Sequence, residues 1–146
     1  MNLKKKYNKR DSIFANFGGA DSLDFSFKLV KIFARFFEKI RIKKIKLNLI
    51  VGPGYNNFFR IRNFVKNIKG IKIYKNPKNF NSIISNSKIA IVSAGTICWE
   101  LAYLGILGII VPVSRNQNRV AKQLNKDEYF YSIEKKIFSS KNIMIN

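Results

Sequence analysis

Short apolar runs alternate with longer amphipathic segments along most of this chain, and this alternation restricts its fold more than any other feature. Such an order is typical of α/β proteins, in which parallel strands form one sheet and helices cover its faces. The pattern predicts strands over residues 12–17, 46–51, 71–74, 89–92 and 108–112. It predicts helices over 57–67, 79–86, 98–104 and 119–124, and a first helix that Asp21 and Asp24 cap and whose apolar stripe runs from Leu29 to Ile40. Residues 129–131 can add another strand, and 133–138 a short helix. We therefore expect a doubly wound, Rossmann-like parallel sheet of five or six strands.

Four turns rich in Gly, Ser or Asn follow predicted strands. In a parallel sheet, ligands bind beyond the carboxyl ends of the strands, so these turns are expected on one rim. They are Gly18-Gly19, Gly52-Pro53-Gly54-Tyr55, Ser93–Thr96 and the polar loop Ser114–Asn118. Each turn taken alone has an ordinary explanation in turn chemistry.

The segment Ser93-Ala94-Gly95-Thr96-Ile97-Cys98-Trp99-Glu100 carries the strongest functional signal. It joins an apolar strand to a helix through small residues, and the unpaired amides at such a helix start can hold a phosphate. Glu100 lies about one turn into that helix, where a carboxylate can accept hydrogen bonds from ribose hydroxyls. A solvated Glu100, a packed Trp99 and a small buried Cys98 remain the alternative interpretation.

Composition and length restrict the domain organisation and the cellular compartment of this protein. The 146 residues form one domain, which we divide into a basic flexible arm (1–11), a Rossmann-like domain (12–126) and a C-terminal extension (127–146). A single cysteine and the lack of a signal peptide favour a cytoplasmic protein. No apolar stretch is long enough to span a membrane.

The sequence contains no histidine, so a Ser-His-Asp or Cys-His centre within this chain is excluded. We expect neither a metal nor a cofactor. The formal net charge of +20 would suit nucleic-acid binding, but the lysines are dispersed along the chain. Dispersed lysines are more typical of a solvated surface, and nucleic acid is an unlikely partner.

Several motifs occur together in an order that resembles a known family. They are Phe17–Asp21, Val51–Tyr55, Ser93–Gly105 and Asn116-Gln117. The resemblance is to the carboxyl-terminal half of the UDP-2,4-diacetamido-2,4,6-trideoxy-β-L-altropyranose hydrolases of pseudaminic acid synthesis. It extends more remotely to the UDP-binding domain of family 28 glycosyltransferases. It implies one half of a GT-B arrangement, in which two Rossmann-like domains face each other across a cleft.

The resemblance also implies roles for individual residues. Ser93, Ala94, Gly95 and Thr96 would hold phosphate, and Glu100 would bind the ribose. Asn116 and Gln117 would approach the sugar, and Gly18 and Gly19 would line the cleft floor. Gly52, Gly54 and Tyr55 complete the predicted UDP-sugar site. Ile97 stands where the family places Ser or Thr, which removes one hydroxyl contact.

In these hydrolases, water attacks the anomeric carbon and UDP leaves, and the histidine thought to activate the water lies in the N-terminal domain. The expected partners are therefore a UDP-sugar and an N-terminal domain, which could be a separate chain. Without that domain, we expect an exposed apolar patch near the rim, formed by Phe17, Tyr55, Phe58 and Trp99. A stand-alone, non-catalytic nucleotide-binding or partner-binding module remains the alternative function.

Overall fold

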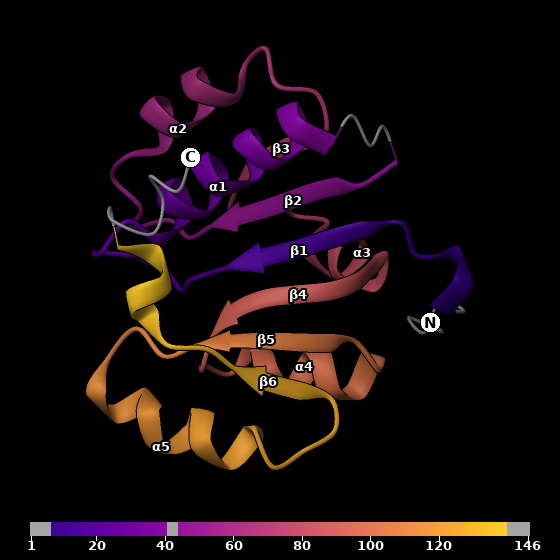
Figure 1. Cartoon of the computed structure of the whole chain (residues 1–146), viewed down its shortest axis with the longest axis vertical. Helices are drawn as coiled ribbons and strands as arrows, with labels where there is room; N and C mark the ends of the chain where they lie inside the picture. Colours follow the sequence, from indigo (N-terminus) through magenta and orange to yellow (C-terminus); the bar gives the residue numbers. More distant parts are fainter. Residues whose placement is uncertain (1–6, 41–43, 140–146) are drawn as a thin grey trace.

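The computed structural model describes residues 7–40 and 44–139 of the chain (Figure 1). A single sheet of six parallel strands lies in the order β3-β2-β1-β4-β5-β6, which confirms the predicted α/β fold. The strands are β1 (Ser12–Asn16), β2 (Lys46–Val51), β3 (Ile71–Lys75), β4 (Ser87–Ser93), β5 (Leu107–Val111) and β6 (Phe130–Ser132).

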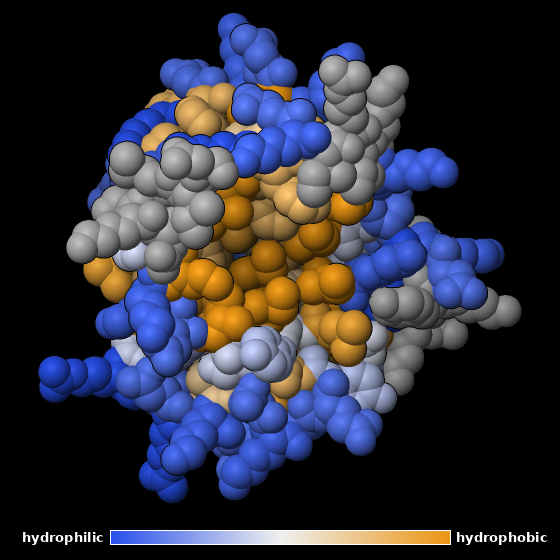
Figure 2. All heavy atoms as spheres, in the orientation of Figure 1, coloured by the Kyte–Doolittle hydropathy of each residue, from blue (hydrophilic) through white to orange (hydrophobic). Residues whose placement is uncertain are grey.

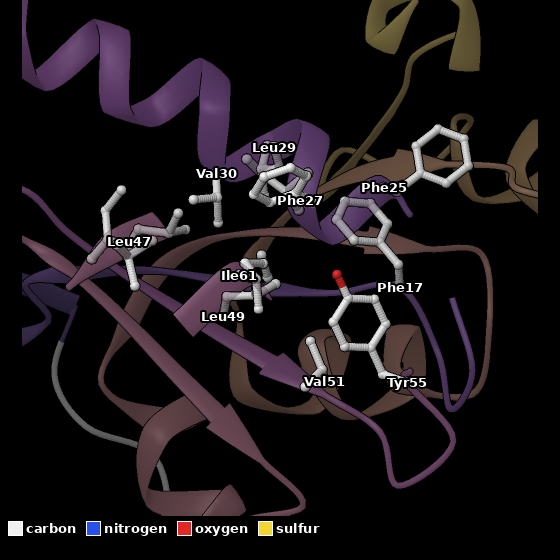
Figure 3. Close-up of a cluster of buried hydrophobic side chains, with 14 of the residues drawn as sticks. Phe17, Phe25, Phe27, Leu29, Val30, Leu47, Leu49, Val51, Tyr55 and Ile61 are labelled. Atoms are coloured by element: carbon white, nitrogen blue, oxygen red, sulfur yellow. The ribbon is translucent and has the colours of Figure 1, made fainter. Parts of the chain in front are cut away.

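Helices lie on both faces of this sheet and bury a separate apolar cluster on each. They are α1 (Phe25–Ile40), α2 (Phe58–Val65), α3 (Phe80–Ser85), α4 (Ile97–Leu104) and α5 (Arg115–Leu124), with short 3-10 turns η1 (Tyr7–Lys9) and η2 (Lys135–Phe138). α1 and α2 enclose the first cluster, which includes Leu47, Leu49 and Ile61 (Figure 3). α3, α4 and α5 contribute to the second cluster, which includes Phe14 and Ile110.

The strand order reverses beside β1. The first three strands run outward from β1 to β3, and α3 then carries the chain back to β4 on the other side of β1. The carboxyl ends of β1 and β4 therefore flank a topological switch point, which is where doubly wound sheets bind ligands.

The start of α1 only partly follows its predicted capping. The Asp21 carboxylate accepts hydrogen bonds from the backbone amides of Phe25 and Ser26 at 2.9 and 2.8 Å, as a cap should. Asp24 has a positive φ of 55°, and its carboxylate accepts hydrogen bonds from Tyr55 and Asn57 instead. The turn after β1 is thereby tied to the turn after β2.

The fifth helix begins four residues earlier than the sequence predicted. The segment expected as a polar loop, Ser114–Asn118, lies within α5 from Arg115 onward, so that prediction was wrong. Gln117 accepts a hydrogen bond from the Val113 amide at 3.1 Å, and Ser114 occupies the N-cap position. The spacing Ser-x-x-Gln is the sequence signal of this helix start.

Part of the predicted N-terminal arm, residues 1–6, lies outside the described residues. Arg10 is buried, and its guanidinium donates hydrogen bonds to the carbonyls of Leu104 and Gly105 at 2.6 and 3.0 Å. These contacts satisfy carbonyls that the end of α4 leaves unpaired. The described helices include none that is long and apolar enough to cross a membrane.

Candidate functional site

A cavity of about 330 Å³ lies where β1, β2 and β3 end, beside the start of α4. It brings together five of the predicted site residues, namely Gly18, Gly19, Gly52, Thr96 and Glu100. Its position agrees with the rule that ligands bind beyond the carboxyl ends of parallel strands near a switch point.

The two glycine turns form one wall through direct contact between their backbones. A Cβ atom on Gly52 would lie 2.3 Å from the Gly19 carbonyl oxygen, so only glycine fits there. The Gly54 amide donates a hydrogen bond to the same carbonyl at 3.1 Å. Gly18 has a φ of +90°, a conformation that side chains other than glycine rarely adopt.

Asn16, which sequence reasoning missed, fixes the entrance to the first glycine turn. Its side-chain amide donates a hydrogen bond to the Ile50 carbonyl at 2.9 Å, and its carbonyl oxygen accepts one from the Gly18 amide at 3.1 Å. The position of Asn16 at the end of a predicted strand was a usable signal, because that end lies on the ligand-binding rim.

The opposite wall is the start of α4. Ser93 and Ala94 are buried behind the turn, while Thr96 is exposed at the cavity. The first amides of a helix have no partner within that helix and carry its positive dipole end. The wall formed by Thr96 and Ile97 therefore suits a phosphate group.

Glu100 follows Thr96 by four residues, so both side chains lie on the same face of α4. No lysine or arginine is among the described residues that line this cavity. An anion would thus be held by backbone amides, and Glu100 is the one ionisable group among the lining residues that the structure describes.

The two residues that precede Glu100, Cys98 and Trp99, differ in their surroundings. Trp99 is 73% exposed on another face of α4, so packing in the core, one of its predicted alternatives, was wrong. Cys98 is buried, and burial raises the pKa of its thiol to about 11. A thiol with that pKa is a poor nucleophile at neutral pH, as the sequence interpretation expected.

Tyr55 does not reach the cavity. It is 1% exposed, and Figure 3 shows its ring in the apolar cluster near Phe17 and Val51. Its hydroxyl donates a 2.5 Å hydrogen bond to Asp24. Burial, with the nearby Asp24 carboxylate, raises the pKa of Tyr55 far above its ordinary value. Tyr55 therefore supports the two glycine turns from behind.

Asn116 and Gln117 also lie away from the cavity, in the first turn of α5. The Gln117 side chain accepts a hydrogen bond from the Val113 amide, just before this helix, and Asn116 is exposed and accepts a 2.5 Å hydrogen bond from Ser114. A smaller hollow of about 170 Å³ separates Ser114 from the turn after β1. Because Gly19 lines both hollows, α5 begins at the outer end of the same rim.

The predicted exposed patch near the rim is not formed. Phe17 is 3% exposed and packs against Phe25 and Phe138, and Tyr55 is equally buried. Phe58 is half-buried, which leaves Trp99 as the exposed member. The rings of Phe17 and Tyr55 are part of the apolar core, because α1 and η2 cover the end of β1.

The remaining lining comes from the turn after β3, which was not among the predicted site residues. Asn76 has a φ of 45°, and its amide donates a hydrogen bond to the Val51 carbonyl at 3.1 Å. Pro77 and Phe80 add an apolar wall. Within the described residues, no three His, Cys, Asp or Glu side chains lie close enough to hold a metal ion.

The family model for the glycosyltransferase family 28 C-terminal domain matches residues 17–144. The chain belongs to this family. Its match therefore includes every predicted site residue, from Gly18 to Gln117, and the whole cavity except Asn16.

The proteins to which this chain is similar are longer than it is. An uncharacterized protein of Methanocaldococcus jannaschii, MJ1062, is 25% identical over 138 residues, which are 92% of this chain and 26% of that protein. The crystal structure of Acinetobacter baumannii MurG superposes with a TM-score of 0.70 at 14% identity, over 97% of this chain and 41% of MurG. The spinosyn rhamnosyltransferase SpnG complexed with thymidine diphosphate gives 0.61 at 13% identity, over 94% and 34%. The chain thus spans less than half the length of each, and the two solved structures share its fold.

Proposed function

We propose that this family 28 domain binds the UDP part of a UDP-sugar in the cavity between the glycine turns and α4. The observation that carries the proposal is the placement of Glu100 four residues beyond Thr96, with both residues lining the cavity at the start of α4. Diphosphate oxygens suit the amides, and ribose hydroxyls suit the carboxylate. Pro77 and Phe80 offer an apolar surface to the flat base. SpnG, a structural neighbour, was solved with a nucleoside diphosphate, which is consistent with this proposal.

We further propose that the chain acts as the nucleotide-binding half of a hydrolase or glycosyltransferase that releases UDP from an amino sugar. The motif resemblance favours a hydrolase of pseudaminic-acid-like synthesis. In this proposal a second domain supplies the base that activates the attacking group, since Glu100 is committed to the ribose and no histidine is present in the sequence. The lack of histidine equally supports the second candidate, a nucleotide-binding module without catalysis.

Replacing Glu100 by Gln tests the nucleotide site. The variant loses a charged acceptor for the ribose hydroxyls, which should cost about 1.5–3 kcal/mol, or roughly ten- to a hundredfold in UDP affinity. Titration calorimetry with UDP would measure the loss, with thymidine diphosphate as a second ligand.

Glu128→Gln is the matched control, because Glu128 is exposed and lies outside the cavity. Its UDP affinity should equal that of the unaltered chain. A well-folded chain that binds no UDP, or equal affinities for the two Glu→Gln variants and the unaltered chain, would reject this site.

A further inference from the structure

One part of the sheet has no helix over it among residues 7–40 and 44–139. α1 and α2 pack over β2 and β3 on one face, and α3, α4 and α5 belong to the apolar cluster on the opposite face. Over β4, β5 and β6, the described residues provide no such layer on the first face, where only Phe138 of η2 joins the apolar cluster. Figure 2 shows apolar surface gathered at the centre of this view, bordered by hydrophilic residues.

The strand register shows that this surface continues the core. Leu47 aligns across the sheet with Ile13, Ile89 and Leu107, and Leu49 aligns with Ala15, Ile91, Ile109 and Tyr131. Leu47 and Leu49 are fully buried beneath α1, whereas Leu107 is 41% and Tyr131 67% exposed. The side chains of this apolar layer are thus fully buried at β2 and exposed to solvent at β5 and β6.

The dimensions of this surface suit one helix. Neighbouring strands lie about 4.8 Å apart, so β4 to β6 span roughly 10 Å, which is the diameter of a helix with its side chains. Parallel sheets are normally covered on both faces. From these observations we propose that the open sheet face, formed by Ile89, Leu107, Ile109 and Tyr131, binds one amphipathic helix of a partner protein whose apolar stripe is flanked by acidic residues.

The positive charge of the chain favours an acidic helix over a second copy of the chain as the partner. The sequence carries 28 Lys and Arg against 8 Asp and Glu, a net charge of +20. Two copies brought face to face would repel each other, whereas an acidic helix would be attracted and steered toward the face. The exposed Lys135 lies in η2, which follows β6 and contacts α1, while the neighbouring Lys136 is paired with Glu134 at 2.8 Å.

A synthetic helical peptide provides the test. It is about 18 residues long, long enough to extend past each end of the strands, with Leu and Ile along one face and Glu on both flanks. Fluorescence anisotropy of the labelled peptide should show saturable binding to the chain. A peptide with Lys in place of Glu should bind at least about tenfold more weakly at low salt, and added salt should reduce this difference.

Substitutions locate the binding. Leu107→Glu should weaken binding of the Glu-flanked peptide at least about tenfold, because it places a carboxylate against the apolar stripe. Val120→Glu is the matched control, since Val120 is 43% exposed on α5, whose buried side packs on the opposite face of the sheet. This control should bind like the unaltered chain, and thermal unfolding would confirm that both variants fold.

Three results would overturn the proposal. One is the failure of the folded, unaltered chain to bind the Glu-flanked peptide. Another is equal binding by the Leu107→Glu and Val120→Glu variants. The third is a dimer in sedimentation that Leu107→Glu dissociates, because the face would then be occupied by a second copy.

Discussion

At the scale of single residues, the contact between Gly52 and Gly19 predicts unequal effects of the same change. Gly52→Ala places a methyl group against the Gly19 backbone, and such overpacking should cost about 1–3 kcal/mol of unfolding free energy. Gly19→Ala meets no atom within 4 Å and should change stability by less than about 0.5 kcal/mol. Urea unfolding would compare the two variants, and equal losses would contradict the observed contact.

Asp21 predicts a dependence on pH. Burial raises the pKa of its carboxyl above the ordinary 3.8, so the folded state binds this proton more tightly than the unfolded state. Its contribution to stability is therefore complete below about pH 4 and is lost as the pH rises through the folded-state pKa. Asp21→Asn has no charge and keeps an acceptor for one of the two amides, since Phe25 and Ser26 donate to different carboxylate oxygens. That loss does not depend on pH.

The stability of Asp21→Asn relative to the unaltered chain should accordingly increase between about pH 3 and pH 7. Urea midpoints measured across this range would show the trend. A difference that stays constant would mean that folding leaves this pKa unchanged, and one that falls with increasing pH would mean that the fold stabilises the carboxylate.

The limits of sequence reasoning at this scale are clear from Tyr55. The motif Gly52-Pro53-Gly54-Tyr55 placed this residue correctly on the rim, but its side chain turns inward to Asp24. A motif gives the position of the backbone and not the direction of a side chain. The partner of the Tyr55 hydroxyl, Asp24, lies 31 residues earlier in the chain and is brought near only by the fold.

At the scale of helices and strands, Arg10 joins the segment before β1 to the end of α4. Arg10→Ala removes two hydrogen bonds from a charged donor to buried carbonyls and should cost about 1.5–3 kcal/mol. Lys9→Ala, at an exposed neighbouring position, should change stability by less than about 0.5 kcal/mol. Chemical unfolding of both variants would test this, and similar losses would show that the guanidinium contributes little.

Strands β1 to β5 could be predicted well because each is a short, largely apolar run with Gly, Pro or Asn at or near one of its ends. β2, for example, has the bounds that the sequence predicted. The start of α5 could not be found from apolar periodicity, because its first four residues, 115–118, are all polar. Its polar capping pattern was the better guide. Cavity residues Gly18, Gly19, Thr96 and Glu100 were predictable because topology alone brings strand ends together.

At the scale of the whole molecule, the open cavity and the lack of histidine predict that this chain alone does not hydrolyse UDP-sugars. A bound sugar would have one side in water, so no group would hold and activate the attacking water. Release of UDP from UDP-N-acetylglucosamine by the purified chain would be measured, with Glu100→Gln as a control for contamination. Turnover at ordinary enzyme rates that Glu100→Gln abolishes would show that this chain carries its own base.

The inward-facing guanidinium of Arg10 also determines how this protein can be shortened or fused to others. The apolar pattern starts at β1, so the sequence alone would suggest a truncation just before this strand. Such a truncation would remove the hydrogen bonds of Arg10 to the carbonyls of Leu104 and Gly105, at the C-terminal end of the helix that carries Glu100. Truncations for crystallisation or screening should therefore retain Arg10. An affinity tag placed directly ahead of β1 would perturb the far end of the nucleotide-binding helix, although the tag and the cavity lie at opposite ends of the sheet.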